Sequence, residues 1–196
     1  MSAGVQNTSE DIEDALTGID VTSAFERLVA SNDFTNGERG DWIGGVITEI
    51  EGFGEILALS GRSDMASLPI DVGTQHDYAT VEFDMIMGDS WDNETGTISI
   101  AGQDVVVGTH SWREGEPDVR VIEGDNDTSV TLTRTSVGSG SFRTGGSSAD
   151  YTYRVKVVAA NDGRELTLGA STTLNSPTHD EFFGIDNVEV RGTNTP

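Results

Sequence analysis

Side-chain oxygens gather near the end of the chain, where a polar loop runs into a segment that alternates like a strand. Asp180 and Glu181 lie in the loop. Asp186 and Asn187 lie at the start of the alternating segment. Carboxylates this close together repel one another unless a cation lies between them. Because carboxylate and amide oxygens suit a hard cation, the pattern predicts a calcium-bearing loop joined to a core strand.

A second cluster of side-chain oxygens lies in the segment 88–94. Asp89, Asp92 and Asn93 are close in sequence, although Asp and Asn also form plain turns without any metal. Calcium takes about six to eight oxygen ligands, so an ion here needs donors from elsewhere in the chain. We expect this segment and the 180–181 loop to meet at one end of the domain and to share an ion.

The same two segments supply the predicted ligand-binding site. An ion held there with an open coordination position could take a ligand carboxylate or hydroxyl. The candidate ligand-binding residues are Trp91, Asp92, His179, Asp180 and Glu181. Trp91 has a second interpretation, as do Trp42 and Trp112, because a tryptophan near a glycine-rich loop can simply fill the end of a core.

A separate structural ion is expected between the first and last strands. Asp186 is flanked by apolar strand residues, and a buried carboxylate there is costly without a cation or hydrogen-bond donors. Glu26 and Asp41 are its candidate partners, because the first and last strands of jelly-roll carbohydrate-binding domains often share a calcium ion. The alternative is that these acids face solvent on edge strands.

The composition is strongly acidic. Among 196 residues, 34 Asp and Glu oppose 11 Lys and Arg, which gives a formal net charge of −23. Nucleic acid and anionic lipid are poor partners for such a surface, since both need a basic face. No apolar run approaches the ~20 residues of a membrane-spanning helix. Either calcium neutralises the clustered acids, or the acidic surface keeps the protein soluble in a salty medium.

Short runs rich in Val, Ile, Thr and Ser, separated by many of the 24 glycines, predict an all-β fold. The segments 78–87 and 151–160 alternate most clearly, and 96–101 with 104–108 is predicted to form a tight hairpin. A second hairpin is expected between 151–160 and 165–168, through an Asn-Asp-Gly turn. We therefore expect a calcium-stabilised, jelly-roll-like β-sandwich.

A single domain over residues 19–196 is the simplest division of the chain. Residues 1–18 are expected to be a lead-in, in which 9–16 fits either a short helix or a linker. No leader with a basic start and an apolar run is visible. The sequence contains no cysteine, so bound metal would take the stabilising place of disulfides.

Enzymatic chemistry has little support in the sequence. His76, His110 and His179 are scattered, without the close spacing of a zinc or catalytic pair. Glu49 and Glu51 would share one face of a strand, as the carboxylates of a glycosidase can. Glycines break that strand soon afterwards. The domain is therefore expected not to be an enzyme, and a glycosidase built on a sandwich is the alternative.

Several short motifs together resemble a known module. They are Val-Glu-Phe-Asp at 81–84, Asp-Ser-Trp-Asp at 89–92, Ile-Ser-Ile-Ala-Gly-Gln at 98–103, Asn-Asp-Gly at 161–163 and Asp-Glu-Phe-Phe-Gly-Ile-Asp-Asn-Val at 180–188. The sequence resembles the calcium-dependent ligand-binding modules near the outer end of RTX-type bacterial adhesins. Within these it is most similar to the β-sandwich domain that captures short peptides.

The resemblance implies a non-enzymatic module that binds several calcium ions and captures short peptide or protein ends on other cells. It also implies an extracellular place within a larger surface adhesin, with roles in cell adhesion and biofilm formation. The isolated domain would be a monomer. A calcium-dependent lectin, in which the ion holds sugar hydroxyls, is the first alternative, and the glycosidase is the second.

Overall fold

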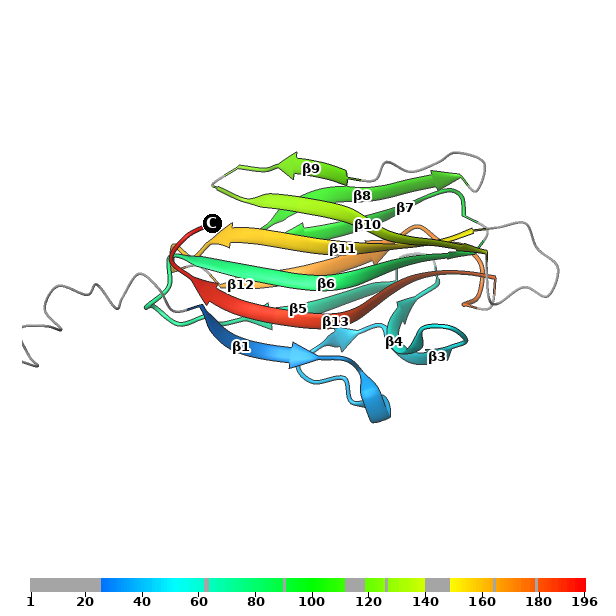
Figure 1. Cartoon of the computed structure of the whole chain (residues 1–196), viewed down its shortest axis with the longest axis horizontal. Helices are drawn as coiled ribbons and strands as arrows, with labels where there is room; N and C mark the ends of the chain where they lie inside the picture. Colours follow the sequence, from blue (N-terminus) through cyan, green and yellow to red (C-terminus); the bar gives the residue numbers. More distant parts are fainter. Residues whose placement is uncertain are drawn as a thin grey trace, which may run out of the picture.

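The computed structural model describes residues 26–61, 64–89, 91–111, 119–125, 127–139, 149–163, 165–178 and 180–196. At 89, 92, 108–111, 136–139 and 149–150 it describes the backbone alone. These residues form strands and one short 3-10 turn (Figure 1). The elements are β1 (Arg27–Asn32), η1 (Thr35–Gly37), β2 (Ile43–Gly44), β3 (Val46–Ile50), β4 (Gly54–Leu59), β5 (Met65–Ile70), β6 (Tyr78–Asp89), β7 (Asp92–Ile100), β8 (Gln103–Ser111), β9 (Val119–Glu123), β10 (Ser129–Ser139), β11 (Ala149–Ala160), β12 (Leu166–Thr172) and β13 (Glu181–Thr193).

The strands form two antiparallel sheets, which confirms the predicted all-β sandwich. The 8-stranded sheet has the order β3-β4-β13-β6-β11-β10-β9, with β1 also paired to β13. The 5-stranded sheet has the order β2-β5-β12-β7-β8. The chain passes repeatedly from one sheet to the other, as it does in jelly rolls. Figure 1 shows the central strands of the larger sheet, β13, β6 and β11, running side by side across the molecule.

The core lies between the sheets because the central strands alternate. In β6, Val81, Phe83 and Met85 are fully buried, whereas Glu82 and Asp84 are only partly covered on the outer face. This period of two is the one that places alternate side chains on opposite faces of a sheet. The larger sheet therefore presents a charged outer face, on which the site described below lies.

The predicted hairpin between segments 96–101 and 104–108 is confirmed, with its turn at residues 101–102 and not at 102–103. Strands β7 and β8 pair with Ile100 opposite Gln103. Ala101 has a φ of 51° and Gly102 a φ of 78°, so both central residues are left-handed. Such two-residue turns match the twist of the flanking strands.

The second predicted hairpin is wrong. Strand β11 belongs to the larger sheet and β12 to the smaller one, so the Asn-Asp-Gly turn carries the chain across the sandwich. The apolar alternation of both strands is confirmed. Alternation shows that a strand has one buried face, but it does not show which strand lies beside it.

The last strand, β13, is paired differently along its two halves. Its first half pairs with β4 and its second half with β1. A bulge lies between Asp186 and Glu189, where the register to β6 shifts. Asn187 in the bulge has a φ of 49°, a conformation that Asn tolerates better than most residues. The bulge turns Val188 into the core and leaves Asn187 on the outer face.

One edge of the sandwich is closed by an arginine. Arg120 in the edge strand β9 donates hydrogen bonds from Nη1 to the Val107 carbonyl (2.9 Å) and from Nη2 to the Val106 carbonyl (3.3 Å). Both carbonyls belong to β8, the edge strand of the other sheet. Arg120 therefore joins the two sheets at this edge.

Helical structure is limited to η1 in the part of the chain that the structure describes. Within those same ranges, no helix is long and apolar enough to cross a membrane. The predicted short helix at 9–16 and the lead-in 1–18 lie outside the described residues.

Candidate functional site

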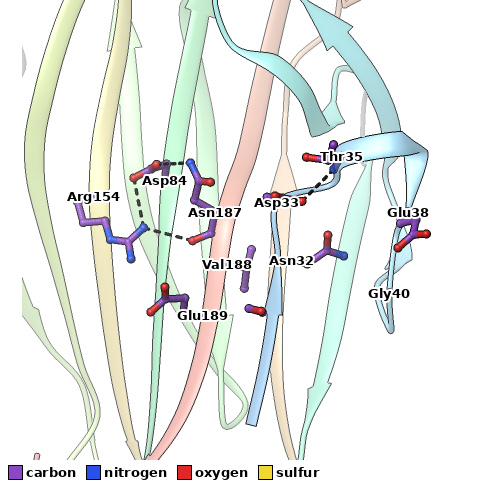
Figure 2. A pocket seen from close by; sticks show the side chains of 11 residues that line it. Asn32, Asp33, Thr35, Glu38, Gly40, Asp84, Arg154, Asn187, Val188 and Glu189 are labelled. Carbon is purple, nitrogen blue, oxygen red and sulfur yellow. Dashed lines mark hydrogen bonds and ion pairs between the residues drawn. The ribbon is translucent and has the colours of Figure 1, made fainter. Parts of the chain in front are cut away.

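A polar groove lies on the outer face of the larger sheet, between β13 and the turn that follows β1. It has a volume of about 640 Å³. Figure 2 shows Arg154, Asp84 and Asn187 on one side and Asp33 with Thr35 on the other. The lining residues are Ser31, Asn32, Asp33, Thr35, Glu38, Gly40, Asp84, Arg154, Asn187, Val188 and Glu189.

A connected hydrogen-bond network forms one wall of this groove. The Asn187 side-chain amide donates to Asp84 Oδ2 (2.8 Å) and to Asp186 Oδ2 (3.3 Å). Arg154 Nη1 donates to Asp84 Oδ1 (3.4 Å) and to the Asn187 carbonyl (3.2 Å), and Nη2 donates to Glu82 Oε2 (3.2 Å). Networks of this kind hold their side chains in fixed orientations.

The register of three strands brings this network together. Asp84 on β6 lies opposite Arg154 on β11 and also opposite Asp186 on β13. Residues paired in this way share one face of the sheet. Asn187 joins them because the bulge turns it outward. The site is therefore built on central strands rather than on loops.

The facing wall comes from the turn after β1. Asp33 Oδ1 accepts a hydrogen bond from the Thr35 backbone N–H (3.1 Å), and Asn32 Oδ1 accepts one from Phe34 (2.7 Å). Hydrogen bonds from Thr35 lower the pKa of Asp33. Phe34 itself is left-handed, with a φ of 56°, and fully buried. These contacts fix the turn that carries Asp33, Thr35 and Glu38.

Asp186 lies beside the groove in an unfavourable electrostatic setting. The pKa of this carboxyl is raised to about 6, chiefly by burial and to a smaller extent by the charges of Asp84 and Asp33, while the hydrogen bond from the Asn187 backbone N–H lowers it. That N–H donates to Asp186 Oδ1 at 2.8 Å. The fold therefore opposes the ionisation of Asp186, mainly because the carboxylate loses hydration and partly because two other acids lie near it.

The backbone places the two predicted calcium loops next to each other. Asp89 at the end of β6 lies opposite Glu181 at the start of β13. Glu181 is buried, and its Oε1 accepts from the Asn175 and Ser176 backbone N–H groups at 2.7 and 2.6 Å. That oxygen therefore fixes the loop before β13. Asp180 is partly buried and donates its N–H to the Pro177 carbonyl at 2.8 Å.

Trp91 is a core residue and offers no surface to a ligand. It is fully buried, its indole N–H donates to the Phe182 carbonyl at 3.2 Å, and its ring packs edge-on against Phe183. Trp42 is likewise buried, against Phe34.

Asn93 is exposed and left-handed, with a φ of 76°. The remaining candidates lie outside the described side chains: Asp89, Asp92, His110, Trp112 and His179.

The expected partners of Asp186 are corrected by the register. Arg27 pairs with Gly192 and Asn32 with Val188, so Glu26 lies at the far end of β1, roughly 16 Å or more from the bulge. Asp41 is exposed and lines a different cavity, on the edge of the sandwich. The acids that influence Asp186 are Asp84 and Asp33.

The described side chains do not assemble a metal site. Among them, no group of three or more His, Cys, Asp or Glu is placed to hold an ion. A calcium site at the end of the sandwich where Asp89 lies opposite Glu181 would need ligands from side chains that the structure does not describe. Calcium binding stays a prediction.

The groove itself was not predicted from the sequence. Asp33, Asp84, Arg154 and Glu189 come from four separate segments of the chain. The usable signal was the charged outer face of the two strands with the clearest alternation, on which Asp84 and Arg154 lie. Nothing in the sequence gives the register that pairs them.

Comparisons with known proteins find little similarity. No family model matches the chain, and no curated protein does. Among solved structures, the chain is similar to a carbohydrate-binding module studied for its specific mannan recognition. That match has 11% sequence identity and a TM-score of 0.41, and it covers 87% of this chain and 100% of that one.

Proposed function

We propose that this domain is a non-enzymatic binding module whose groove takes a neutral carbohydrate. The observation that carries the proposal is the Asn187–Asp84–Arg154 network along one wall of the groove. Sugar hydroxyls donate and accept at the same time, so they suit a surface on which carboxylate acceptors alternate with amide and guanidinium donors. A few convergent polar groups on a rigid support are typical of a ligand site.

The charge of the groove supports a neutral ligand. Its lining holds the carboxylates Asp33, Glu38, Asp84 and Glu189 against a single described cation, Arg154. Arg154 already donates to Asp84 and Glu82. A free carboxylate or phosphate would meet net repulsion here, whereas uncharged hydroxyls would not.

The affinity should be modest because the described lining contains no aromatic side chain. Without a ring on which a sugar can stack, binding rests on hydrogen bonds that replace bonds to water. We therefore expect a Kd of about 0.1–1 mM, which corresponds to about −4 to −5.5 kcal/mol.

The test is a screen of neutral oligosaccharides by calorimetry, followed by Asn187→Gly. Glycine keeps the left-handed backbone and removes the amide, so the bulge should persist while the affinity falls at least tenfold. Asn36→Gly is the matched control, since Asn36 is also left-handed (φ 63°) and does not line the groove. Equal binding by the two variants would contradict the proposal.

Calcium-dependent capture of peptide ends by an adhesin is a second proposal, favoured by the backbone pairing of Asp89 with Glu181. It predicts a different site, at the end of the sandwich, and complete loss of binding in a chelator. Screening peptides with free carboxyl ends, with calcium and with chelator, separates the two proposals. Sugar binding that survives chelation and is lost in Asn187→Gly would support the carbohydrate groove and not the calcium-dependent site.

The glycosidase alternative has its own test. Glu49 lies opposite Glu55 in the β3–β4 hairpin, and Glu55 Oε2 accepts a hydrogen bond from the Gly37 backbone N–H at 3.2 Å. We propose that these acids are structural. Release of shortened sugars from any oligosaccharide that binds would contradict a purely binding role.

A further inference from the structure

A second cavity opens at the edge of the sandwich, opposite the edge that Arg120 closes. It lies between β1 of the larger sheet and β5 of the smaller sheet and has a volume of about 600 Å³. This is within the range of about 300–1,000 Å³ that is usual for ligand sites. The apolar lining residues are Val29, Ala30, Leu68, Pro69, Ile70, Val72 and Val190.

The rim of this edge cleft is acidic. Asp41, Asp71 and Glu165 line it and are exposed. None of the described lining residues is basic. An apolar floor with three carboxylates at the mouth is complementary to a ligand with an apolar body and a positive end.

An unpartnered donor belongs to a residue that lines a narrower cavity beside the cleft. This cavity of about 80 Å³, lined by Trp42, connects the two sites. It shares Ala30, Asp41, Leu68 and Val190 with the edge cleft, and Ser31, Asn32, Gly40 and Val188 with the carbohydrate groove. Trp42 is only 3% exposed, and its indole Nε1 has no hydrogen-bond partner. Buried donors are nearly always paired, so an orphaned one beside a cavity indicates that an acceptor can enter there.

We propose that the edge cleft binds an apolar peptide segment that carries a lysine or arginine. The apolar side chains would pack on Leu68, Ile70 and Val190, and a peptide carbonyl would accept from Trp42 Nε1. The cationic group would lie among the rim carboxylates. The edge cleft shares no lining residue with the proposed carbohydrate groove, although the narrow cavity beside Trp42 adjoins both. Carbohydrate binding does not require the edge cleft.

Side chains rather than strand addition should carry the recognition. Strand β2 pairs with Ser67 and Ala66 of β5, and no described strand pairs with Leu68–Ile70 on that side. Pro69 lies in this free stretch and has no N–H to donate. A proline at such a place interrupts the row of backbone donors that a new strand would need.

The test uses three blocked peptides, acetyl-Val-Leu-Lys-Val-amide and the same peptide with norleucine or glutamate in place of lysine. Calorimetry at low salt should give binding of the lysine peptide, at least tenfold weaker binding of the norleucine peptide and none of the glutamate peptide. Binding of the lysine peptide should weaken as salt is added. Equal binding of the lysine and norleucine peptides, or no binding of either, would overturn the proposal.

Two double variants distinguish attraction by the rim carboxylates from attraction by the acidic surface as a whole. Asp71→Asn with Glu165→Gln should weaken lysine-peptide binding at least tenfold. Asp104→Asn with Glu123→Gln removes the same charge from exposed positions that do not line the cleft and should change the Kd less than twofold. Equal effects of the two double variants would show non-specific attraction and overturn the site.

The buried donor has a direct readout. In a 15N-labelled protein, the Trp42 Nε1–H resonance should shift when the lysine peptide is added, because the indole gains an acceptor. The Trp91 Nε1–H, already bonded to Phe182, is the internal control and should not move. The Asn187→Gly variant should bind the peptide normally. A Trp42 resonance that stays in place while the peptide binds would contradict the proposed pose.

Discussion

Asp186 is the residue whose ionisation the fold opposes most clearly. Its pKa rises from an ordinary value of 3.8 to about 6, mainly through burial and then through Asp84 and Asp33. Between these two values the folded state binds more protons than the unfolded state. The contribution of this group to stability is therefore greatest below pH 3.8 and is lost as the pH rises through 6.

Replacing Asp186 by Asn should remove this pH dependence. We expect Asp186→Asn to be more stable than the parent at pH 8, by about 1 kcal/mol after allowance for solvent screening, and nearly equal to it at pH 4. Urea unfolding of both proteins at the two pH values, in the presence of a chelator, measures the difference.

The same comparison in calcium tests the predicted structural ion. A cation at Asp186 would stabilise the carboxylate and lower its pKa. Asp186→Asn would then be less stable than the parent at pH 8 when calcium is present. A variant that stays more stable in both solutions would contradict a calcium ligand role for Asp186.

At the level of elements, side chains from β3, β4, β6 and β13 form a small second core, apart from the main core between the sheets. This cluster contains Ile50, Ile56, Ala58, Ile86 and Phe182. Phe182 lies opposite Gly88 across β13 and β6. A Cβ atom on Gly88 would overlap the Phe182 ring, so the pair needs glycine at this position.

Gly88→Ala should destabilise the domain by about 2 kcal/mol, because the ring must move out of a packed cluster. Thermal unfolding should show a midpoint lower by several degrees. The second variant, Phe182→Leu, removes the ring, and Gly88→Ala should then cost less in the double variant than alone. Additive effects would contradict the contact as the cause.

The elements that sequence predicts well are those with long, clean alternation. Strands β6 and β11 are predicted almost to their ends, because every second residue is buried from Ala79 to Met87 and from Tyr151 to Ala159. Strands β2 and β5 were missed, since β2 is two residues long and β5 contains Pro69. The partner of β12 was wrong because alternation carries no pairing information.

The candidate groove was missed for a related reason. Its residues are spread from Ser31 to Glu189 and meet only through the register of three strands and the bulge at Asn187. Sequence clustering instead pointed to carboxylates that are neighbours along the chain. Glu181 is an example. It is a predicted calcium ligand, but one of its oxygens already accepts hydrogen bonds from two backbone N–H groups.

For the whole molecule, a net charge of −23 opposes folding through self-repulsion. If calcium neutralises part of this charge, a chelator should lower the melting midpoint by more than about ten degrees, since each ion stabilises the folded state by mass action. Differential scanning calorimetry at low salt, with calcium and with chelator, measures the change.

Monovalent salt is the control for that experiment. Salt added in the presence of chelator should recover only part of the loss in melting midpoint, since salt screens exposed charges and fills no coordination site. An unchanged midpoint in chelator would count against calcium, and full recovery in salt would favour adaptation to a salty medium.

The arginine that joins β9 to β8 bears on how copies of this domain behave at high concentration. An uncovered edge strand is a template on which another chain can form a sheet, and that is a common route to aggregation. Arg120 occupies the carbonyls of Val106 and Val107 and places a guanidinium where a neighbouring strand would have to dock. Together with the repulsion between acidic surfaces, this device favours copies that remain separate when many are crowded together.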